Sequence, residues 1–299
     1  MPWQHRAYEM HRAGISGREI ARQLDIPKST VNDFLQPFRG IDHHDGAKIL
    51  IFDIETAPLE VYSWSLWPKF IDHGQVIQDW TVLTWSAKWL DEPHMMNASV
   101  SPDSPRDDFD VCEQLWQLLD EADIVVAHNG DKFDLKRMNT RFFLLGLPEP
   151  SHYRSVDTLK VAKRRFNFTS NRLDYISKMT GGPGKVSHEG FSMWKKCLMG
   201  DADALRAMQE YNDGDVIELE RVYKEMRGWD NRHPNLGMYS DSEEVCPNCG
   251  SDNLEATGRF YTTQTQKYAT FRCGDCGKIS RSRASTTVES PKRRGYIPA

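Results

Sequence analysis

The sequence predicts an α/β protein with a small all-α domain before the central domain and a small β module after it. Three observations lead to this fold class. Short helical patterns joined by a tight turn fill residues 1–40, apolar strands alternate with amphipathic helices over residues 48–228, and two C-x-x-C pairs lie within residues 244–284. Residues 41–47 are predicted to be a linker and residues 285–299 a basic, disordered tail.

Composition and charge narrow the class of protein further. The 299 residues contain no apolar run long enough to cross a membrane and no secretion signal after Met1, and six cysteines are too few for a disulfide scaffold. We therefore expect a reducing, cytoplasmic setting, which is the host cytoplasm if the protein is viral. The net charge of −5 is uneven: residues 1–40 carry +2, residues 245–299 carry +5, and the residues between them carry −12. Basic ends favour binding of a polyanion, and an acidic centre favours binding of cations. A solvated acidic surface would give the same net charge for the central residues.

Short helices are predicted for the first forty residues. Residues 3–13 have apolar side chains at helical spacing, and Ser16 with Glu19 forms a capping box that starts a second helix. A tight turn over residues 25–27 leads into a third helix from about Lys28. This third helix directs its apolar side chains inward, namely Val31, Phe34 and Leu35.

The pattern E-I-A-x-x-L-x-I-x-x-S-T-V at Glu19–Val31 resembles the helix-turn-helix of resolvase- and transposase-type DNA-binding domains. The resemblance covers about forty residues and implies that the last helix enters the major groove through its amino-terminal residues. The residues implied to contact DNA are Lys28, Ser29, Thr30 and Asn32. A three-helix domain used for protein contacts remains the alternative.

A buried strand is predicted at Ile49 to Phe52, and two carboxylates follow it directly. Asp53 and Glu55 are two residues apart, so on a strand they point to the same face. Two adjacent negative charges are costly to bury unless a cation neutralises them. These residues alone leave a divalent-metal site and a solvated strand end equally open.

Further strands and helices are expected along the central domain. Residues 81–90 and 123–128 read as strands, residues 107–122 as an amphipathic helix that holds Cys112, and residues 202–226 as a long helix. Residues 62–90 are rich in tryptophan, which could stack on unpaired bases, but core packing is favoured for most of these side chains. The tryptophans are Trp64, Trp67, Trp80, Trp85 and Trp89.

Two more acids are expected near the first pair. After the strand at residues 123–128, Asn129-Gly130 indicates a turn, so a helix should start near Asp131 as its cap and carry Asp134 on its first turn. In open α/β sheets, sites gather at such strand ends. In the late helix Tyr211 and Asp215 are four residues apart and share one face, whereas Asp213 points elsewhere.

Two other polar segments are open to more than one interpretation. Val156-Asp157-Thr158 is predicted to begin a helix, and its basic cluster could hold phosphates or form a solvated face. The cluster consists of Lys160, Lys163, Arg164 and Arg165. A flexible glycine-rich loop is predicted at residues 181–185, and it lacks the preceding strand and the Ser/Thr of a phosphate-binding loop.

Taken in order, F-D-I-E-T, H-N-G-D-K-F-D and Y-N-D-G-D resemble the three motifs of the DEDD exonucleases, a class of the ribonuclease-H-like superfamily. The third motif is that of the tyrosine-bearing subclass, as in proofreading domains of family B DNA polymerases. The resemblance spans roughly residues 48–228 and implies a mixed sheet flanked by helices. No polymerase module accompanies it, so a free-standing nuclease is expected.

The resemblance also assigns roles to the five motif residues. It implies that Asp53 is shared by two metal ions, that Glu55 and Asp215 complete one ion site, and that Asp134 supports the second. Two hard ions such as Mg²⁺ or Mn²⁺, about 3.5–4 Å apart, activate water and stabilise the leaving oxygen of an in-line displacement. Tyr211 is expected to orient the attacking water without ionising, because the reference pKa of tyrosine is about 10.

The two C-x-x-C pairs predict a structural metal site in the carboxy-terminal module. The pairs are separated by 23 residues and each is followed by glycine, which is typical of a zinc ribbon holding one Zn²⁺. The expected ligands are Cys246, Cys249, Cys273 and Cys276. Between them, residues 258–272 alternate like a hairpin, and such a module is too small to fold without its metal.

The sequence thus predicts a metal-dependent 3′–5′ exonuclease acting on DNA 3′ ends, single-stranded or duplex, in replication, repair or recombination. Asn129 of the second motif is expected to contact the nucleic acid, and proteins of replication or recombination are candidate partners; no membrane is expected. The compact plan suits a phage or mobile element. The alternatives are a structure-specific endonuclease or 3′–5′ exoribonuclease on the same site, and a catalytically inactive DNA-binding regulator.

Overall fold

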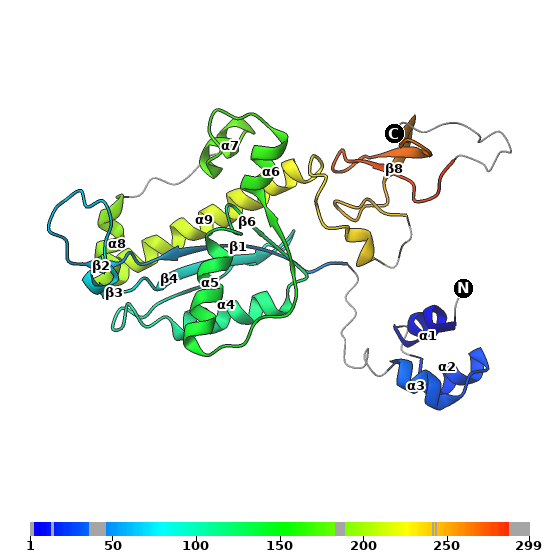
Figure 1. The fold of residues 1–299 in the computed structure, drawn as a ribbon, viewed down its shortest axis with the longest axis horizontal. Coiled ribbons are helices and arrows are strands. Elements are labelled where there is room, and N and C mark those ends of the chain that lie inside the picture. Colours follow the sequence, from blue (N-terminus) through cyan, green and yellow to red (C-terminus); the bar gives the residue numbers. More distant parts are fainter. Residues whose placement is uncertain are drawn as a thin grey trace. The chain divides into compact units, whose positions relative to one another are not determined.

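The computed structural model describes residues 3–12, 15–35, 46–182, 189–240, 242 and 244–286. They belong to two compact units, Met1–Asp45 and Gly46–Ala299, and Figure 1 shows the elements of each. Most of the predicted linker and basic tail, and residues 183–185 of the predicted glycine-rich loop, lie outside the described residues. Among the helices described, none is both long enough and apolar enough to span a bilayer.

The first unit consists of three short helices around a small core of its own. They are α1 (Trp3–Arg12), α2 (Gly17–Leu24) and α3 (Lys28–Leu35), and they bury Ile20, Val31 and Leu35. The predicted turn is confirmed: Asp25 adopts the left-handed conformation at φ 53°, and its backbone N–H caps α2. Only half of the predicted capping box forms. Ser16 accepts from the Glu19 backbone, but the Glu19 carboxylate binds Arg22 and Gln23 instead of reaching back.

A five-stranded mixed sheet forms the centre of the second unit, in the order β5-β4-β1-β6-β7. β1 pairs antiparallel with β4 and parallel with β6, and β7 continues the parallel side. The strands predicted near residues 49, 81 and 123 are confirmed. The strands are β1 (Ile49–Thr56), β4 (Val82–Trp89), β5 (Met96–Ser99), β6 (Ile124–Ala127) and β7 (Arg154–Asp157). The helix predicted to begin at Val156-Asp157-Thr158 is confirmed from Thr158 onward, with Asp157 as its cap, but Val156 and Asp157 themselves end β7.

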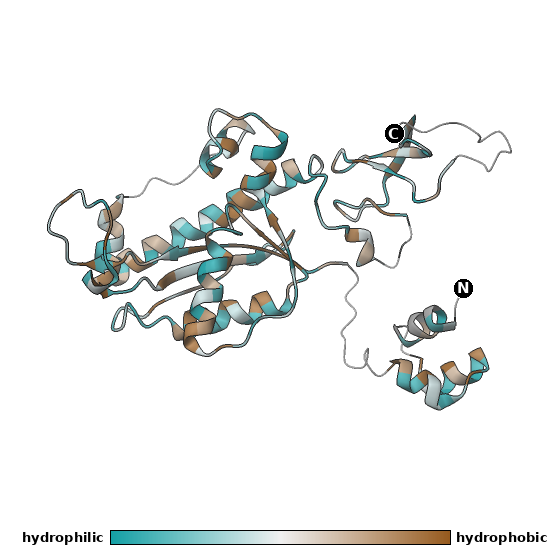
Figure 2. Cartoon of the chain, viewed as in Figure 1, coloured by the Kyte–Doolittle hydropathy of each residue, from teal (hydrophilic) through white to brown (hydrophobic). Residues whose placement is uncertain are grey.

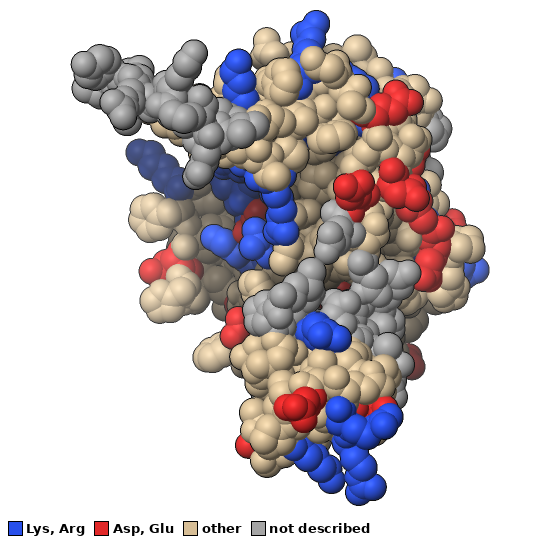
Figure 3. Space-filling view, turned by 90° about the vertical axis from the view of Figure 1, so that its right-hand side faces the viewer, with Lys and Arg blue, Asp and Glu red and all other residues tan. Residues whose placement is uncertain are grey.

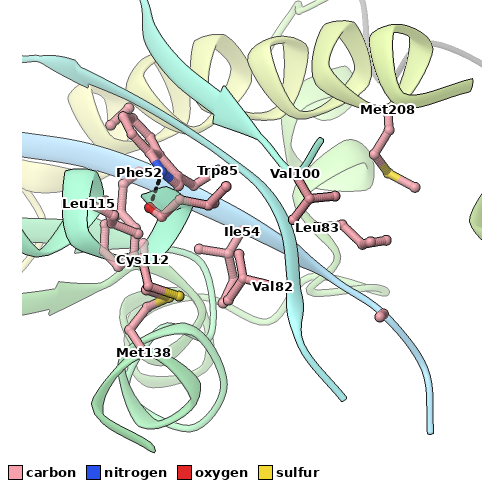
Figure 4. Close-up of a cluster of buried hydrophobic side chains, with 14 of the residues drawn as sticks. Phe52, Ile54, Val82, Leu83, Trp85, Val100, Cys112, Leu115, Met138 and Met208 are labelled. Atoms are coloured by element: carbon pink, nitrogen blue, oxygen red, sulfur yellow. Dashed lines mark hydrogen bonds between the residues drawn. The ribbon is translucent and has the colours of Figure 1, made fainter. Parts of the chain in front are cut away.

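Helices cover both faces of this sheet, and the sheet separates two clusters of buried apolar side chains. One apolar cluster lies under α4 and α5, where Phe52 of β1 meets Leu115 and Met138 (Figure 4). Trp85 also packs there, and its indole N–H donates to the Val111 carbonyl at 2.7 Å. The other cluster lies under α6, α7 and much of α9. The helices are α4 (Phe109–Glu121), α5 (Asp134–Leu145), α6 (Thr158–Arg165), α7 (Leu173–Met179), α8 (Phe191–Leu198) and α9 (Ala202–Arg227).

Strand β1 supplies both clusters because its side chains alternate. Leu50, Phe52 and Ile54 face the α4 and α5 side, while Ile49 and Ile51 face the α9 side. Its central apolar run stands out in Figure 2 against the mixed colours of the surrounding helices. The α9 side of β1 therefore begins with two isoleucines and continues, in the same alternation, with Asp53 and Glu55.

The carboxy-terminal module is a three-stranded antiparallel sheet of β8 (Leu254–Thr262), β9 (Lys267–Cys273) and β10 (Ile279–Arg281). The predicted hairpin is confirmed, and β10 adds a strand that the sequence did not indicate. The module packs on the carboxyl end of α9: the side chain of Asn248 donates to the Asp230 carbonyl at 2.8 Å, and Lys278 donates to the same carbonyl at 2.7 Å. The approach is close, since a Cβ on Gly228 would lie 2.0 Å from the Cys276 carbonyl oxygen.

A small two-stranded ribbon leaves the sheet just beyond β1. β2 (Glu60–Val61) pairs with β3 (Val76–Gln78), which follows the 3-10 turn η2 (His73–Gln75). The base of the ribbon closes where the Ala57 backbone N–H donates to the Thr81 carbonyl at 2.8 Å.

Candidate active site

Three carboxylates converge where β1 passes beneath α9. Asp53 and Glu55 come from β1 and Asp215 from α9, and one oxygen of each lies within 4.8 Å of the others. The two strand acids are half-buried and Asp215 is buried. Because like charges this close repel in a medium of low dielectric, the arrangement favours a bound divalent cation. Carboxylate oxygens are the ligands that Mg²⁺ and Mn²⁺ prefer.

The neighbouring turn of α9 fixes the orientation of Asp53. Asn212 is fully buried, and its side-chain amide donates to Asp53 Oδ2 at 2.7 Å. Sequence reasoning did not identify this residue. The signal was present in the third motif, because Asn212 lies three residues before Asp215 and so shares its helix face.

Asp134 is the first residue of α5 and lies against β1 between the two strand acids. Its carboxylate is buried, accepts a hydrogen bond from the Ile54 backbone, and has one oxygen, Oδ1, without a hydrogen-bond partner. Burial raises the pKa of Asp134 to about 7, against the opposing effect of the backbone hydrogen bonds. A buried carboxylate oxygen without a partner is what a cation site requires. The four acids of the predicted site are thus gathered around one stretch of β1.

Asp157 is a further buried acid beside this site that the sequence did not indicate as part of it. Its Oδ1 accepts from the backbone N–H groups of Asn129 and Leu159, both at 3.0 Å, and so caps α6. Its Oδ2 is buried without a hydrogen-bond partner, and its negative charge adds to the rise in the pKa of Asp134. Asn129 itself has a left-handed backbone at φ 73°. Asp157 therefore holds the turn that delivers Asp134 to the site.

The start of α5 differs from the prediction. The helix begins at Asp134 rather than near Asp131, and Phe133 occupies the cap position. Asp131 is not the cap: its carboxylate pairs with Lys160, which reaches it from α6. The chain between Asn129 and Phe133 forms a separate hydrogen-bonded turn, so the helix starts later.

Two of the four basic residues of the α6 cluster form ion pairs within the protein. Lys160 pairs with Asp131, and Arg164 pairs with the buried Asp230 at 2.5 Å. On the face shown in Figure 3, basic and acidic side chains form separate small groups, and neither sign covers the face. These contacts favour a structural role for half of the cluster over phosphate binding.

Tyr211 and Asp213 flank Asn212 on α9 and differ in their surroundings. Tyr211 is buried and packs with the cluster under α4 and α5, one helical turn before Asp215. Asp213 accepts from Ser86 Oγ at 2.6 Å and from the Asn97 amide at 3.0 Å, on β4 and β5. The exclusion of Asp213 from the acid cluster is therefore confirmed.

The four predicted zinc ligands form a second candidate metal centre. One sulfur of each lies within 4.8 Å of the others, and the Cys246–Cys276 and Cys249–Cys273 sulfur pairs are both 3.5 Å apart. Sulfurs on a tetrahedral Zn²⁺ with bonds of about 2.3 Å lie roughly 3.8 Å apart, close to these separations. A hydrogen bond with Cys246 and burial raise the pKa of Cys249, so a tetrathiolate needs a cation. The donor set fits zinc.

The residues predicted to contact DNA from α3 are only partly accessible. The side chains of Lys28, Ser29 and Thr30 are exposed at the start of the helix, as a groove-reading helix requires. Asn32 is half-buried, and its side-chain oxygen lies 2.6 Å from the place where a Cβ on Gly17 would stand. Asn32 therefore packs against the start of α2. DNA contact by these four residues stays a prediction.

Comparison with known proteins bears on the fold of the central domain. Residues 81–227 match the RNase_H_2 family model of the RNase_H superfamily, and this range contains Asp134, Tyr211 and Asp215 but begins after Asp53 and Glu55. Together with the sheet topology, it gives the central domain a ribonuclease-H-like fold. A family B DNA polymerase from the hyperthermophilic archaeon Pyrobaculum calidifontis is similar at 17% identity and a TM-score of 0.46. The similarity covers 61% of this chain and 25% of the polymerase chain. No curated protein sequence matches.

Proposed function

We propose that this chain, with its ribonuclease-H-like domain, is a metal-dependent 3′–5′ exonuclease that hydrolyses phosphodiester bonds of DNA. The observation that carries the proposal is the convergence of Asp53, Glu55 and Asp215 within 4.8 Å, with the unpartnered Oδ1 of Asp134 beside the same strand. Four carboxylates brought together from three separate segments repel one another and lose hydration, so a bound cation is the expected compensation.

The four acids would hold two divalent ions, which supply an activated water and stabilise the leaving oxygen. The chain's own residues provide the positioning. Asn212 holds the Asp53 carboxylate in one orientation, and the Ile54 backbone does the same for Asp134. Tyr211 lies one helical turn before Asp215 and would orient the attacking water through its hydroxyl.

The proposed 3′–5′ polarity and the proposed preference for DNA over RNA rest on the motifs and on the two small modules. Y-N-D-G-D resembles the tyrosine-bearing exonuclease subclass, which supports release of nucleotides from 3′ ends. The three-helix unit exposes Lys28, Ser29 and Thr30 on α3, which supports duplex binding, and the half-buried Asn32 completes the predicted set. Asn129 is proposed to contact the strand near the acids. The four cysteines are proposed to bind one structural zinc ion.

End-labelled substrates test the proposal directly. Single-stranded DNA, duplex DNA and RNA are each incubated with Mg²⁺ and with EDTA, and the products are separated by length. Stepwise, EDTA-sensitive shortening of DNA from the 3′ end is expected. One internal cut would indicate an endonuclease, shortening of RNA alone an exoribonuclease, and tight binding without cleavage a DNA-binding regulator.

The site itself is tested with Asp53→Ala and Asp215→Ala. Each should abolish metal-dependent release of 3′ nucleotides, because each removes one of the converging carboxylates, while DNA binding is largely kept. Asp213→Ala is the matched control, since Asp213 belongs to the same motif but bonds to Ser86 and Asn97 instead. Undiminished cleavage by purified Asp53→Ala protein would overturn the assignment.

A further inference from the structure

The ribbon that follows β1 carries a strongly exposed aromatic loop, residues 62–71, which we call the tryptophan loop. Trp64 is 100% exposed, Trp67 90% and Phe70 80%, and Tyr62 and Leu66 are also exposed. The sequence favoured core packing for most of the tryptophans in this region. That holds for Trp85 and in part for Trp80 and Trp89, but not for the two in the loop. An exposed apolar patch of this kind marks a binding surface.

The base of the tryptophan loop adjoins the acid cluster. Ala57, at the closed base of the ribbon, is two residues beyond Glu55. On the returning side, the Asp79 carbonyl accepts from Arg106 at 3.0 Å, and the Trp80 ring lies 4.4 Å from the Arg137 guanidinium. Arg137 lies on α5 one turn after Asp134. The loop is therefore tied on both sides to elements that carry the acids.

The chemistry of the loop suits unpaired bases. Residues 62–71 contain no acid and one base, Lys69, so the tip does not repel phosphates. Each nucleobase has an apolar face that stacks on aromatic side chains, so such stacking does not depend on the sequence of the strand. In a duplex these faces are covered by neighbouring base pairs, whereas a single strand offers them.

We propose that the tryptophan loop stacks on unpaired bases of a nucleic acid strand whose 3′ end lies at the acid cluster. The inference rests on the proposed nuclease function and names its substrate class: a single-stranded 3′ end, in preference to a blunt duplex. The two tryptophans stack on bases a few nucleotides from the 3′ end, and the acids act on the terminal phosphodiester.

The test compares full-length Trp64→Ala/Trp67→Ala protein with the wild type. Binding of a fluorescent single strand of about six nucleotides, too short to serve the duplex-binding unit, is measured by anisotropy in EDTA. Loss of two stacking contacts should raise Kd by about tenfold or more. With Mn²⁺, KM for the same strand should rise in parallel, while hydrolysis of thymidine 5′-p-nitrophenyl phosphate, which does not reach the loop, should stay unchanged.

Two control proteins separate aromatic stacking from other effects. Trp64→Phe/Trp67→Phe keeps aromatic rings and should retain most of the affinity. Trp229→Ala removes another exposed tryptophan, one that packs on Phe166 at 5.6 Å, and should bind like the wild type. Because both loop side chains are exposed, thermal unfolding of the alanine protein should match that of the wild type.

Failure of this inference is distinguishable from failure of the nuclease proposal. Unchanged Kd and KM in the alanine protein, with a wild type that shortens the strand, would overturn the loop proposal alone. A wild type that cleaves nothing would overturn the nuclease proposal, and the binding comparison in EDTA would still decide the role of the loop. Effects confined to self-association or to phosphatidylglycerol vesicle binding would instead show that a second copy or a membrane covers the loop.

Discussion

The acid cluster and the four-cysteine cluster are assembled in opposite ways. The acids come from β1, from the start of α5 and from α9, and the apolar packing of the sheet against those helices brings them together. The cysteines come from two nearby turns of one small module. Within residues 244–286, the buried apolar side chains of the described structure are those of Cys246 and Cys273 alone. The acid cluster is assembled by the hydrophobic core of the central domain, whereas the four-cysteine cluster takes the place of a hydrophobic core in its module.

This difference predicts what each proposed metal would contribute. The central domain buries apolar side chains on both faces of its sheet, so it should hold its fold and its acids in place without an ion. The carboxy-terminal module has too little apolar burial to fold unaided, so zinc binding and folding are one event there. Removing the proposed catalytic ions should lower activity, and removing the proposed zinc should unfold the module.

The largest expected effect is that of Cys273→Ser on the module. Structural zinc sites have apparent binding free energies of about 10–16 kcal/mol, far more than the module's few buried side chains can replace. The bound zinc should fall from one ion to none, and backbone amides of β8 and β9 should exchange rapidly with solvent while those of β1 and β6 stay protected. Zinc content and hydrogen exchange by mass spectrometry measure both.

The matched control for that experiment is Cys197→Ala. Cys197 is a fully buried thiol of α8, belongs to the cluster under α4 and α5, and is remote from the four-cysteine cluster in sequence. The change should lower the free energy of unfolding slightly and leave zinc content unchanged. A Cys273→Ser protein whose β8 and β9 remained protected would show that the module folds without its metal and would remove the contrast between the two sites.

Asn212→Leu probes how far the core pre-organises the acids. It deletes the hydrogen bond to Asp53 Oδ2 and also removes the Asn212 Oδ1, which is buried without a hydrogen-bond partner. Loss of such a supporting contact to a metal ligand costs about 10–100-fold in metal affinity or activity. Mg²⁺ titration of the cleavage rate measures this loss.

Asp213→Asn is the control for Asn212→Leu, because it changes the next residue of α9 and keeps an oxygen that can accept from Ser86 and Asn97. Its Mg²⁺ dependence should follow the wild type. If Asn212→Leu did the same while its thermal stability fell, the residue would support the fold and not the acids.

The features predicted best from the sequence were those fixed by local pattern. The apolar run before Asp53, the long amphipathic α9 and the two C-x-x-C pairs each specify one structure by residue type and spacing. Asp53 and Glu55 alone left two interpretations open, and the order of the later motifs favoured the metal site. In the structure, one carboxylate oxygen of Asp215 lies within 4.8 Å of an oxygen of each of these two acids.

The features that the sequence did not predict are those that depend on contacts with neighbouring helices and strands. β5 and β7 have four residues each and include polar side chains such as Asn97 and Arg154, so only pairing with β4 and β6 makes them strands. Asp131 has good cap chemistry, but Lys160 from another helix binds it. The exposure of Trp64 and Trp67 is likewise invisible in composition, because it depends on which element covers the loop.

The smallest expected effect concerns the contact between the two contrasted regions. Lys278 is buried, and its ammonium group donates to the Asp230 carbonyl at 2.7 Å and to Asn231 Oδ1 at 3.0 Å. Burial lowers the pKa of Lys278, so part of the gain from these bonds is spent on desolvation. The Asp230 carbonyl also keeps its bond from Asn248 when the lysine is removed.

Lys278→Met should therefore destabilise the docked module by only about 1 kcal/mol, seen as a several-fold rise in the exchange rates of β9 and β10 amides. Zinc content and nuclease activity should not change, because neither set of ligands is touched. Arg259→Met, which removes an exposed charge from the same module, should leave exchange unchanged. If Lys278→Met instead lowered activity together with exchange protection, the carboxyl end of α9 would couple the two regions. The acids would then depend on the zinc module, and the central domain could not be regarded as self-sufficient.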